Sequence, residues 1–167
     1  MVKNIVTFVA LFFFASASAQ ECVILLHGLA RTSKSMLPMQ TRLESEKYRV
    51  ANISYPSRKK PIRELAPLAV GSGVKACGDD ASQIHFVTHS LGGILVRFHL
   101  SKEKLERLGR VVMLAPPNQG SEVVDNLKNV PGYKFLNGPA GIELGTDPKS
   151  IPSNLGPVNF YTGIIAG

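Results

Sequence analysis

The 167-residue sequence contains few of the features that metal, membrane-spanning and nucleic-acid-binding proteins require. Its two cysteines and four scattered histidines do not supply a compact ligand set for zinc, so no metal site is expected. After residue 14, no apolar run is long enough to cross a bilayer. The formal charge of +7 is modest, and no basic stripe interleaved with aromatic side chains indicates nucleic acid as a partner. Internal repeats and low-complexity linkers are also missing, which predicts one globular domain.

The first nineteen residues have the pattern of a secretory signal peptide. Lys3 precedes an apolar run at residues 5–14, and alternating alanines and serines follow as far as Ala19. About ten apolar residues are too few for a membrane anchor. We therefore expect cleavage after Ala19 and export of residues 20–167, to the periplasm or the medium, as a soluble domain. Its positive charge favours peripheral contact with anionic lipid surfaces.

Cys22 and Cys77 would meet an oxidising compartment after export, where disulfides persist. Cys22 begins one predicted strand and Cys77 precedes another, and two parallel neighbouring strands would place both cysteines near the same end of the sheet. A disulfide between them is therefore one expectation. Two separate thiols are the alternative, because the geometry of a disulfide is restrictive.

Short apolar runs alternate with longer amphipathic segments, as in a parallel sheet covered by helices. The strands are expected at residues 22–26, 48–54, 83–88, 111–114 and 160–166. The helices are expected at 35–46, 62–71 and 91–108, with Gly109 closing the last of them. Residues 118–157 are rich in glycine, proline and asparagine and predict a loop-rich excursion with one short helix at 123–127. The expected fold class is α/β, a doubly wound and mainly parallel sheet with helices on both faces.

Residues 86–93, FVTHSLGG, place Ser90 between an apolar strand and a helix that begins with paired glycines. A serine hydroxyl is a poor nucleophile at neutral pH and needs both a base and donors that hold the oxyanion. A sharp elbow between strand and helix exposes the serine and directs the next N–H, that of Leu91, at the developing charge. Gly92 and Gly93 are small, as the close contact between strand and helix requires. The stretch therefore predicts Ser90 as a nucleophile.

Further residues support the elbow and complete the predicted oxyanion hole. Thr88 stands where the usual GxSxG pattern has glycine, and it is small enough to serve there. His89 is expected to support the turn, since an elbow directs neighbouring side chains apart. After the first strand, His27 and Gly28 form a tight turn that offers the N–H of Leu29 as the second oxyanion donor.

Three stretches together resemble the α/β-hydrolase fold family, specifically bacterial lipases and esterases: LLHGLART at 25–32, FVTHSLGG at 86–93 and VVMLAPPNQGSE at 111–122. The resemblance implies that Ser90 accepts an acyl group while Leu29 and Leu91 bind the oxyanion. The implied reaction is hydrolysis of a small acyl ester or lipid through an acyl-enzyme, without a cofactor. An acyltransferase on the same scaffold and a relative that only binds ligands are the alternatives.

In that family the catalytic acid and then the histidine base follow the serine. Here His85 is most simply a strand residue, and His99 lies about 13 Å along the helix that follows the serine. No histidine follows residue 99. Glu122 is the best candidate for the acid, although it has no histidine to orient. The resemblance therefore implies that the acid and base are missing, that the chain lacks a final strand and helix, and that it is inactive alone.

Overall fold

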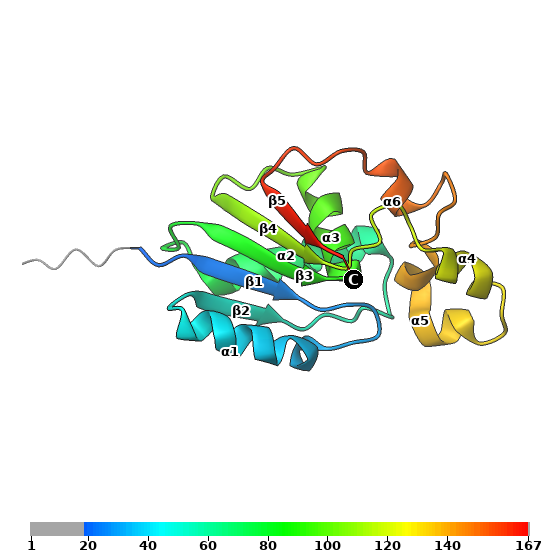
Figure 1. Cartoon of the computed structure of the whole chain (residues 1–167), viewed down its shortest axis with the longest axis horizontal. Coiled ribbons are helices and arrows are strands. Elements are labelled where there is room, and N and C mark those ends of the chain that lie inside the picture. Colours follow the sequence, from blue (N-terminus) through cyan, green and yellow to red (C-terminus); the bar gives the residue numbers. More distant parts are fainter. Residues whose placement is uncertain (1–18, 167) are drawn as a thin grey trace, which may run out of the picture.

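The computed structural model of the chain describes residues 19–166, so the predicted signal peptide lies almost entirely outside the described residues. A single sheet of five parallel strands runs through the molecule in the order β2-β1-β3-β4-β5 (Figure 1). The strands are β1 (Cys22–Leu26), β2 (Arg49–Ile53), β3 (Ile84–His89), β4 (Leu108–Leu114) and β5 (Thr162–Ile165). The prediction of a parallel α/β sheet is confirmed.

Helices cover the sheet on both faces. The helices α2 (Ile62–Cys77) and α3 (Leu91–Leu100) pack on one face, and α1 (Leu37–Ser45), preceded by the short 3-10 helix η1 (Ser33–Met36), packs on the other. Successive side chains of a strand point to opposite faces. Ile24 and Leu26 of β1 accordingly join the core beneath α2 and α3, whereas Val23 and Leu25 pack with Met36. This double coverage explains why β1 is apolar throughout.

Helix α2 extends six residues beyond the predicted end at residue 71. Pro67 lies inside it and removes one helical hydrogen bond. The packing of its buried face explains the difference. A Cβ built on Gly73 would lie 2.6 Å from Cγ2 of Ile24, so glycine lets the second half of α2 lie directly on β1.

Helix α3 ends at Leu100, so the prediction of a helix to residue 108 is wrong. The helix must return the chain to the amino end of the sheet, and ten residues span about 15 Å, close to the length of a strand. Residues 102–107 form an irregular loop with turns, so its lysines and arginine lie on a loop and not on a helix. Gly109 does not cap the helix but lies within β4, where a Cβ would come within 2.3 Å of the His85 ring.

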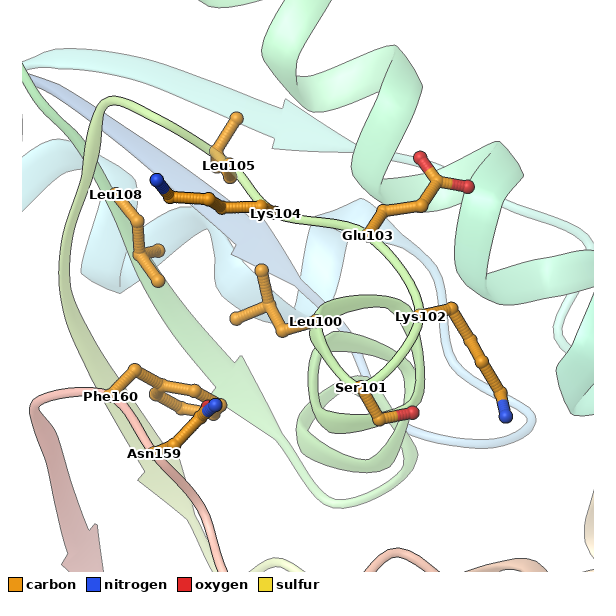
Figure 2. Close-up of a pocket in the computed structure, with 9 residues that line it drawn as sticks. All are labelled: Leu100, Ser101, Lys102, Glu103, Lys104, Leu105, Leu108, Asn159 and Phe160. Carbon is orange, nitrogen blue, oxygen red and sulfur yellow. The ribbon is translucent and has the colours of Figure 1, made fainter.

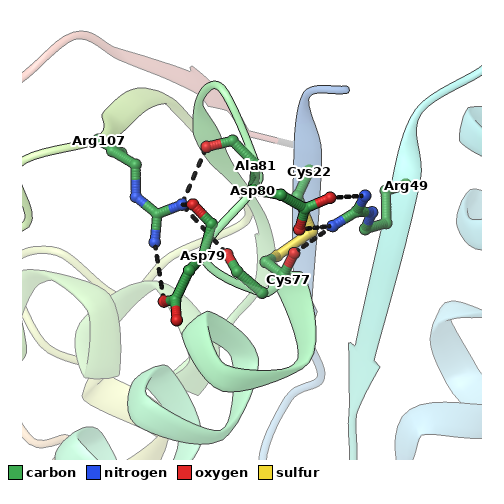
Figure 3. Close-up of polar contacts among 8 residues, drawn as sticks. Cys22, Arg49, Cys77, Asp79, Asp80, Ala81 and Arg107 are labelled. Atoms are coloured by element: carbon green, nitrogen blue, oxygen red, sulfur yellow. Dashed lines mark hydrogen bonds and ion pairs between the residues drawn. A yellow bond between two sulfur atoms is a disulfide. The ribbon is translucent and has the colours of Figure 1, made fainter. Parts of the chain in front are cut away.

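A disulfide joins Cys22 to Cys77, which confirms the first of the two expectations. It connects the start of β1 to the end of α2, and polar contacts surround it (Figure 3). Arg49 donates hydrogen bonds to both carboxylate oxygens of Asp80 at 2.7 Å and to the carbonyl of Cys77. Arg107 donates to three carbonyls of the turn between α2 and β3. This cluster fastens the amino end of the sheet.

The excursion between β4 and β5 contains three helices where the sequence predicted one. They are α4 (Glu122–Leu127), α5 (Tyr133–Ile142) and α6 (Ile151–Asn154), and Figure 1 shows them beyond the carboxyl ends of the strands. The excursion is attached to the start of α2, because Glu143 accepts a hydrogen bond at 2.7 Å from the N–H of Ile62. A Cβ on Gly141 would lie 3.1 Å from the side chain of Leu29, so α5 also packs on the loop after β1. Within residues 19–166, no helix is long and apolar enough to span a membrane.

Candidate active site at the carboxyl end of the sheet

The loops that follow β1 and β3 meet at the carboxyl edge of the sheet. These two strands are parallel neighbours, with Leu26 opposite Thr88, yet β2 lies on one side of the pair and β4 on the other. The chain therefore winds in opposite directions from this point. In open α/β sheets, ligands bind at such a switch point, outside the carboxyl ends of the strands.

Ser90 occupies a strained turn between β3 and α3. Its φ of 50° and ψ of -117° lie outside the regions that residues with a Cβ ordinarily adopt. Two hydrogen bonds hold this conformation: its N–H donates to the carbonyl of Leu114 at 2.9 Å, and its carbonyl accepts from the N–H of Gly93 at 3.0 Å. A strained residue persists only where its surroundings impose the conformation. Ser90 thus has the backbone of a nucleophile elbow.

Glycines allow the two loops to approach each other closely. A Cβ on Gly92 would lie 2.6 Å from the carbonyl oxygen of Leu26, so the first turn of α3 lies directly on the end of β1. A Cβ on Gly28 would lie 2.7 Å from Nδ1 of His89 and 3.4 Å from Cβ of Ser90. The loop after β1 therefore lies against the serine.

The two predicted oxyanion donors are backbone N–H groups at this contact. Leu91 is the first residue of α3, where an N–H has no acceptor within the helix. Leu29 lies in the turn after β1, and in the described part of the chain neither N–H donates a hydrogen bond. Most backbone donors in folded proteins are paired. Two N–H groups without an acceptor, one in the loop after β1 and one at the start of α3, are therefore available to a ligand, and their role as oxyanion donors stays a prediction.

His27 is fully buried in the same loop and makes two hydrogen bonds with the main chain. Its Nδ1 lies 2.8 Å from the carbonyl oxygen of Gly28, and its Nε2 lies 3.4 Å from the backbone nitrogen of Tyr55. Burial lowers the pKa of His27, which favours the neutral ring. Because both nitrogens are engaged, this imidazole is not free to accept the proton of Ser90.

The other histidines lie in three different places. Nδ1 of His85 accepts a hydrogen bond at 2.9 Å from the N–H of Arg110, near the amino end of the sheet. His99, on α3, has its Nε2 3.8 Å from a carboxylate oxygen of Glu103 in the loop that follows, and burial lowers the pKa of His99. His89 borders a cavity of about 380 Å³ between α1 and β4. Across residues 19–166, no histidine nitrogen is hydrogen-bonded to the Ser90 hydroxyl.

The remaining predicted site residues have supporting or peripheral positions. Thr88 is fully buried, and its hydroxyl donates a long hydrogen bond, 3.4 Å, to the carbonyl of Val112. Its Oγ1 would be 3.3 Å from a Cβ on Gly93, so the strand and α3 are close at this position. Glu122 is the first residue of α4 and is exposed, and no histidine contacts it among the residues described. Its role as an acid stays a prediction.

Sequence reasoning missed Tyr55 and Ser57, which follow β2. Both are buried, at 6% and 4% exposure, and both contact the loop that carries Leu29. The sequence indicated only that Tyr55 and Pro56 end a strand. No pattern along the chain connects Tyr55 with His27 or Ser57 with Ala30, because these contacts depend on how β1 and β2 are paired.

A larger cavity than the one beside His89 lies away from this site. It has a volume of about 460 Å³ and lies beside the loop between α3 and β4, at the start of β4 (Figure 2). Its lining combines apolar and charged side chains: Leu100, Ser101, Lys102, Glu103, Lys104, Leu105, Leu108, Asn159 and Phe160. None of the predicted catalytic residues is among them. We therefore place the candidate active site at the switch point and not in this larger cavity.

No protein-family profile and no curated protein sequence matches this chain. Solved structures do match it. Phospholipase PlaB from Legionella pneumophila superposes with a TM-score of 0.64 at 21% identity, over 88% of this chain and 39% of its own. A structure of the metagenome-derived lipolytic enzymes LipS and LipT gives a TM-score of 0.66 at 14% identity, over 90% of this chain and 73% of its own. An extracellular α/β-hydrolase from a Paenibacillus species gives 0.55 at 13% identity, over 87% and 90%.

The chain has the α/β-hydrolase fold. The resemblance seen in the three sequence stretches is thereby confirmed at the level of the fold. The chain spans about two fifths of the length of PlaB, so it corresponds to only a part of that phospholipase. Within the α/β-hydrolase fold of this chain, Ser90 lies at the elbow and Leu29 in the loop after β1.

Proposed function

We propose that this α/β-hydrolase domain carries the nucleophile and the oxyanion hole of a carboxylic ester hydrolase. The observation that supports the proposal most directly is the strained backbone of Ser90, together with the N–H groups of Leu29 and Leu91, which have no acceptor within residues 19–166. A binding protein has no need of a strained serine at this position. Strain of this kind is characteristic of sites where a group must be presented to a substrate.

The proposed reaction has two steps through an acyl-enzyme. Oγ of Ser90 attacks the ester carbonyl carbon and loses its proton to a base, while the carbonyl oxygen becomes an oxyanion held by the N–H groups of Leu29 and Leu91. The C–O bond to the alcohol breaks, and the alcohol leaves with that proton. Water then attacks the acyl group, and the carboxylic acid leaves as Ser90 recovers its proton.

The base is the part of this reaction that the described residues do not supply. His27 has both nitrogens engaged, and His85 and His99 lie away from the serine. His89 lies beside Gly28 near Ser90, but within residues 19–166 no hydrogen bond joins its ring to the serine hydroxyl. We therefore expect residues 20–167 alone to turn over esters no faster than the uncatalysed background.

The proposed substrates are esters with an apolar acyl chain. The outer part of the excursion exposes several large apolar side chains: Val123, Leu127, Val130, Phe135 and Leu136. Such a surface favours contact with lipid over contact with water. The lipolytic enzymes among the structural neighbours make lipid esters a reasonable first choice for the assay. The disulfide is compatible with export to an oxidising compartment.

Chemical rescue tests the proposal, because it supplies the base from outside. Residues 20–167 are mixed with 4-nitrophenyl butyrate, with and without added imidazole, and the matched control is Ser90→Ala. We expect imidazole to produce a burst of one nitrophenolate per protein and a butyryl group on Ser90, detected by mass spectrometry. The release that imidazole causes by itself is measured in Ser90→Ala. An equal signal in that variant, or no acyl group on Ser90, would contradict the proposal.

A further inference from the structure

We infer that Tyr55 and Ser57, on the segment after β2, are positioning residues that hold the N–H of Leu29 in place for the oxyanion. The inference rests on the proposed function, since it assigns Leu29 to the oxyanion hole. It concerns the loop at residues 27–30, which Tyr55 and Ser57 hold on both sides of Leu29.

The first contact fixes the start of the loop through Tyr55. The hydroxyl of Tyr55 donates a hydrogen bond to the carbonyl of His27, and its ring stacks on the imidazole with the centroids 4.0 Å apart and 8° between the planes. Tyr55 is 6% exposed, and burial raises the pKa of its hydroxyl. The hydroxyl therefore stays protonated and remains a donor.

The hydrogen bonds of His27 determine its tautomer. Its Nδ1 faces a carbonyl oxygen, that of Gly28, and must donate, whereas its Nε2 faces the N–H of Tyr55 and must accept. Only the neutral ring with its proton on Nδ1 satisfies both contacts. The imidazole thus joins the main chain of the loop to the main chain of the segment after β2.

The second contact fixes the end of the loop through Ser57. Oγ of Ser57 accepts a hydrogen bond at 3.2 Å from the N–H of Ala30, which has a positive φ of 54°. Ser57 is 4% exposed, and its own N–H donates to the carbonyl of Tyr55 at 2.8 Å. An alanine in the left-handed region is unfavourable unless its surroundings hold it there. The Ser57 hydroxyl supplies one such restraint.

Leu29 therefore lies between two held residues and donates no hydrogen bond within residues 19–166. A donor that is held before the oxyanion forms does not have to be ordered during the reaction, and such preorganisation makes it effective. Loss of either contact should leave the fold intact but allow the N–H of Leu29 to move. The expected kinetic effect is a lower rate of acylation with little change in KM.

The experiment compares Tyr55→Phe and Ser57→Ala with a matched control, Ser150→Ala. Ser150 is 8% exposed and also uses its hydroxyl in a hydrogen bond, but it lies in the excursion before α6. In each 15N-labelled protein, NMR measures the order parameter of the Leu29 amide and the rate of hydrogen exchange of the Ala30 amide. Ring 15N spectra report the tautomer of His27 in the unaltered chain.

We expect Ser57→Ala to exchange the Ala30 amide roughly fivefold faster, from the loss of one hydrogen bond, and Tyr55→Phe to lower the order of Leu29. Ser150→Ala should change neither. Unaltered amides of Leu29 and Ala30 in both variants, or a His27 ring protonated on Nε2, would overturn the inference. These readouts do not need turnover, so they remain decisive even where Ser90 fails to take an acyl group.

The kinetic test uses the same variants in the imidazole assay. Both are expected to lower the acylation rate of Ser90 about tenfold at unchanged KM, a smaller loss than the hundredfold or more that follows removal of an oxyanion donor. The Ser150→Ala control should acylate at the unaltered rate. A rise in KM without loss of rate would contradict a positioning role.

Discussion

Breaking the disulfide between Cys22 and Cys77 should cost this chain a large part of its stability. The two cysteines are separated by 55 residues, and the bond closes β1, α1 and β2 together with α2 into one loop. The chain-entropy relation for a loop of that length gives about 4 kcal/mol. A domain of ordinary stability unfolds with about 5–15 kcal/mol, so the bond accounts for a considerable fraction.

Urea unfolding at pH 7, followed by circular dichroism, measures this cost in the double variant Cys22→Ala/Cys77→Ala. Both side chains are fully buried, so the variant also loses packing, and about 4 kcal/mol is the minimum expected. The unaltered chain in the presence of a reductant provides the matched control, because it retains both sulfur atoms and loses only the bond. A loss below about 1 kcal/mol in both samples would refute the reasoning, since the loop would then be ordered without its cross-link.

Three other predictions concern the elbow, the ion pair and the exposed surface. Gly92→Ala, whose Cβ would lie 2.6 Å from a main-chain oxygen of β1, should lower both urea stability and Ser90 acylation. Gly71→Ala, with open space around its Cβ, should raise the free energy of unfolding by up to about 1 kcal/mol. Equal changes in stability for the Gly92 and Gly71 variants would contradict a steric role for Gly92. The hydrogen bond from Arg49 lowers the pKa of Asp80 to about 2, so Asp80→Asn should lower the free energy of unfolding at pH 7. The difference in unfolding free energy between this variant and the unaltered chain should shrink as pH falls from 3.8 through about 2. A difference that stays constant over this range would refute the ion pair as its cause. Phe135 is 88% exposed, and Phe135→Ser should weaken co-sedimentation with phosphatidylglycerol vesicles severalfold. Tyr161, just before β5, is 85% exposed, and Tyr161→Ser should leave vesicle binding unchanged. Equal binding by the two variants would exclude the excursion as the lipid contact.

The strands and the elbow were predictable because their signals are local. Buried parallel strands are short apolar runs, and each of the five predicted runs overlaps a strand of the sheet. The stretch around Ser90 identified the turn because a sharp strand–helix elbow requires small residues at fixed positions. The disulfide was predictable only as one of two outcomes, since sequence does not give the distance between Cys22 and Cys77.

The lengths of the helices were not predictable, because packing decides them. Residues 101–107 suit a helix by propensity, but α3 ends once it has returned the chain to the amino end of the sheet. Pro67 lies inside α2 and removes one hydrogen bond, and the burial of the apolar face of the helix against β1 outweighs that loss. In both helices the tertiary contacts override the local preference.

The sequence by itself determined the order of the strands along the chain, the serine at the elbow and the glycines around it. These features depend on residues close together in the chain, so the periodicity of the apolar residues and the small size of the glycines can be recognised in the sequence. Only the tertiary structure decided which residues hold the loop of Leu29, because Tyr55 and Ser57 reach it through the pairing of β1 with β2. Pairing between distant strands depends on the packing of the whole sheet, so no short stretch of sequence specifies the residues it brings together.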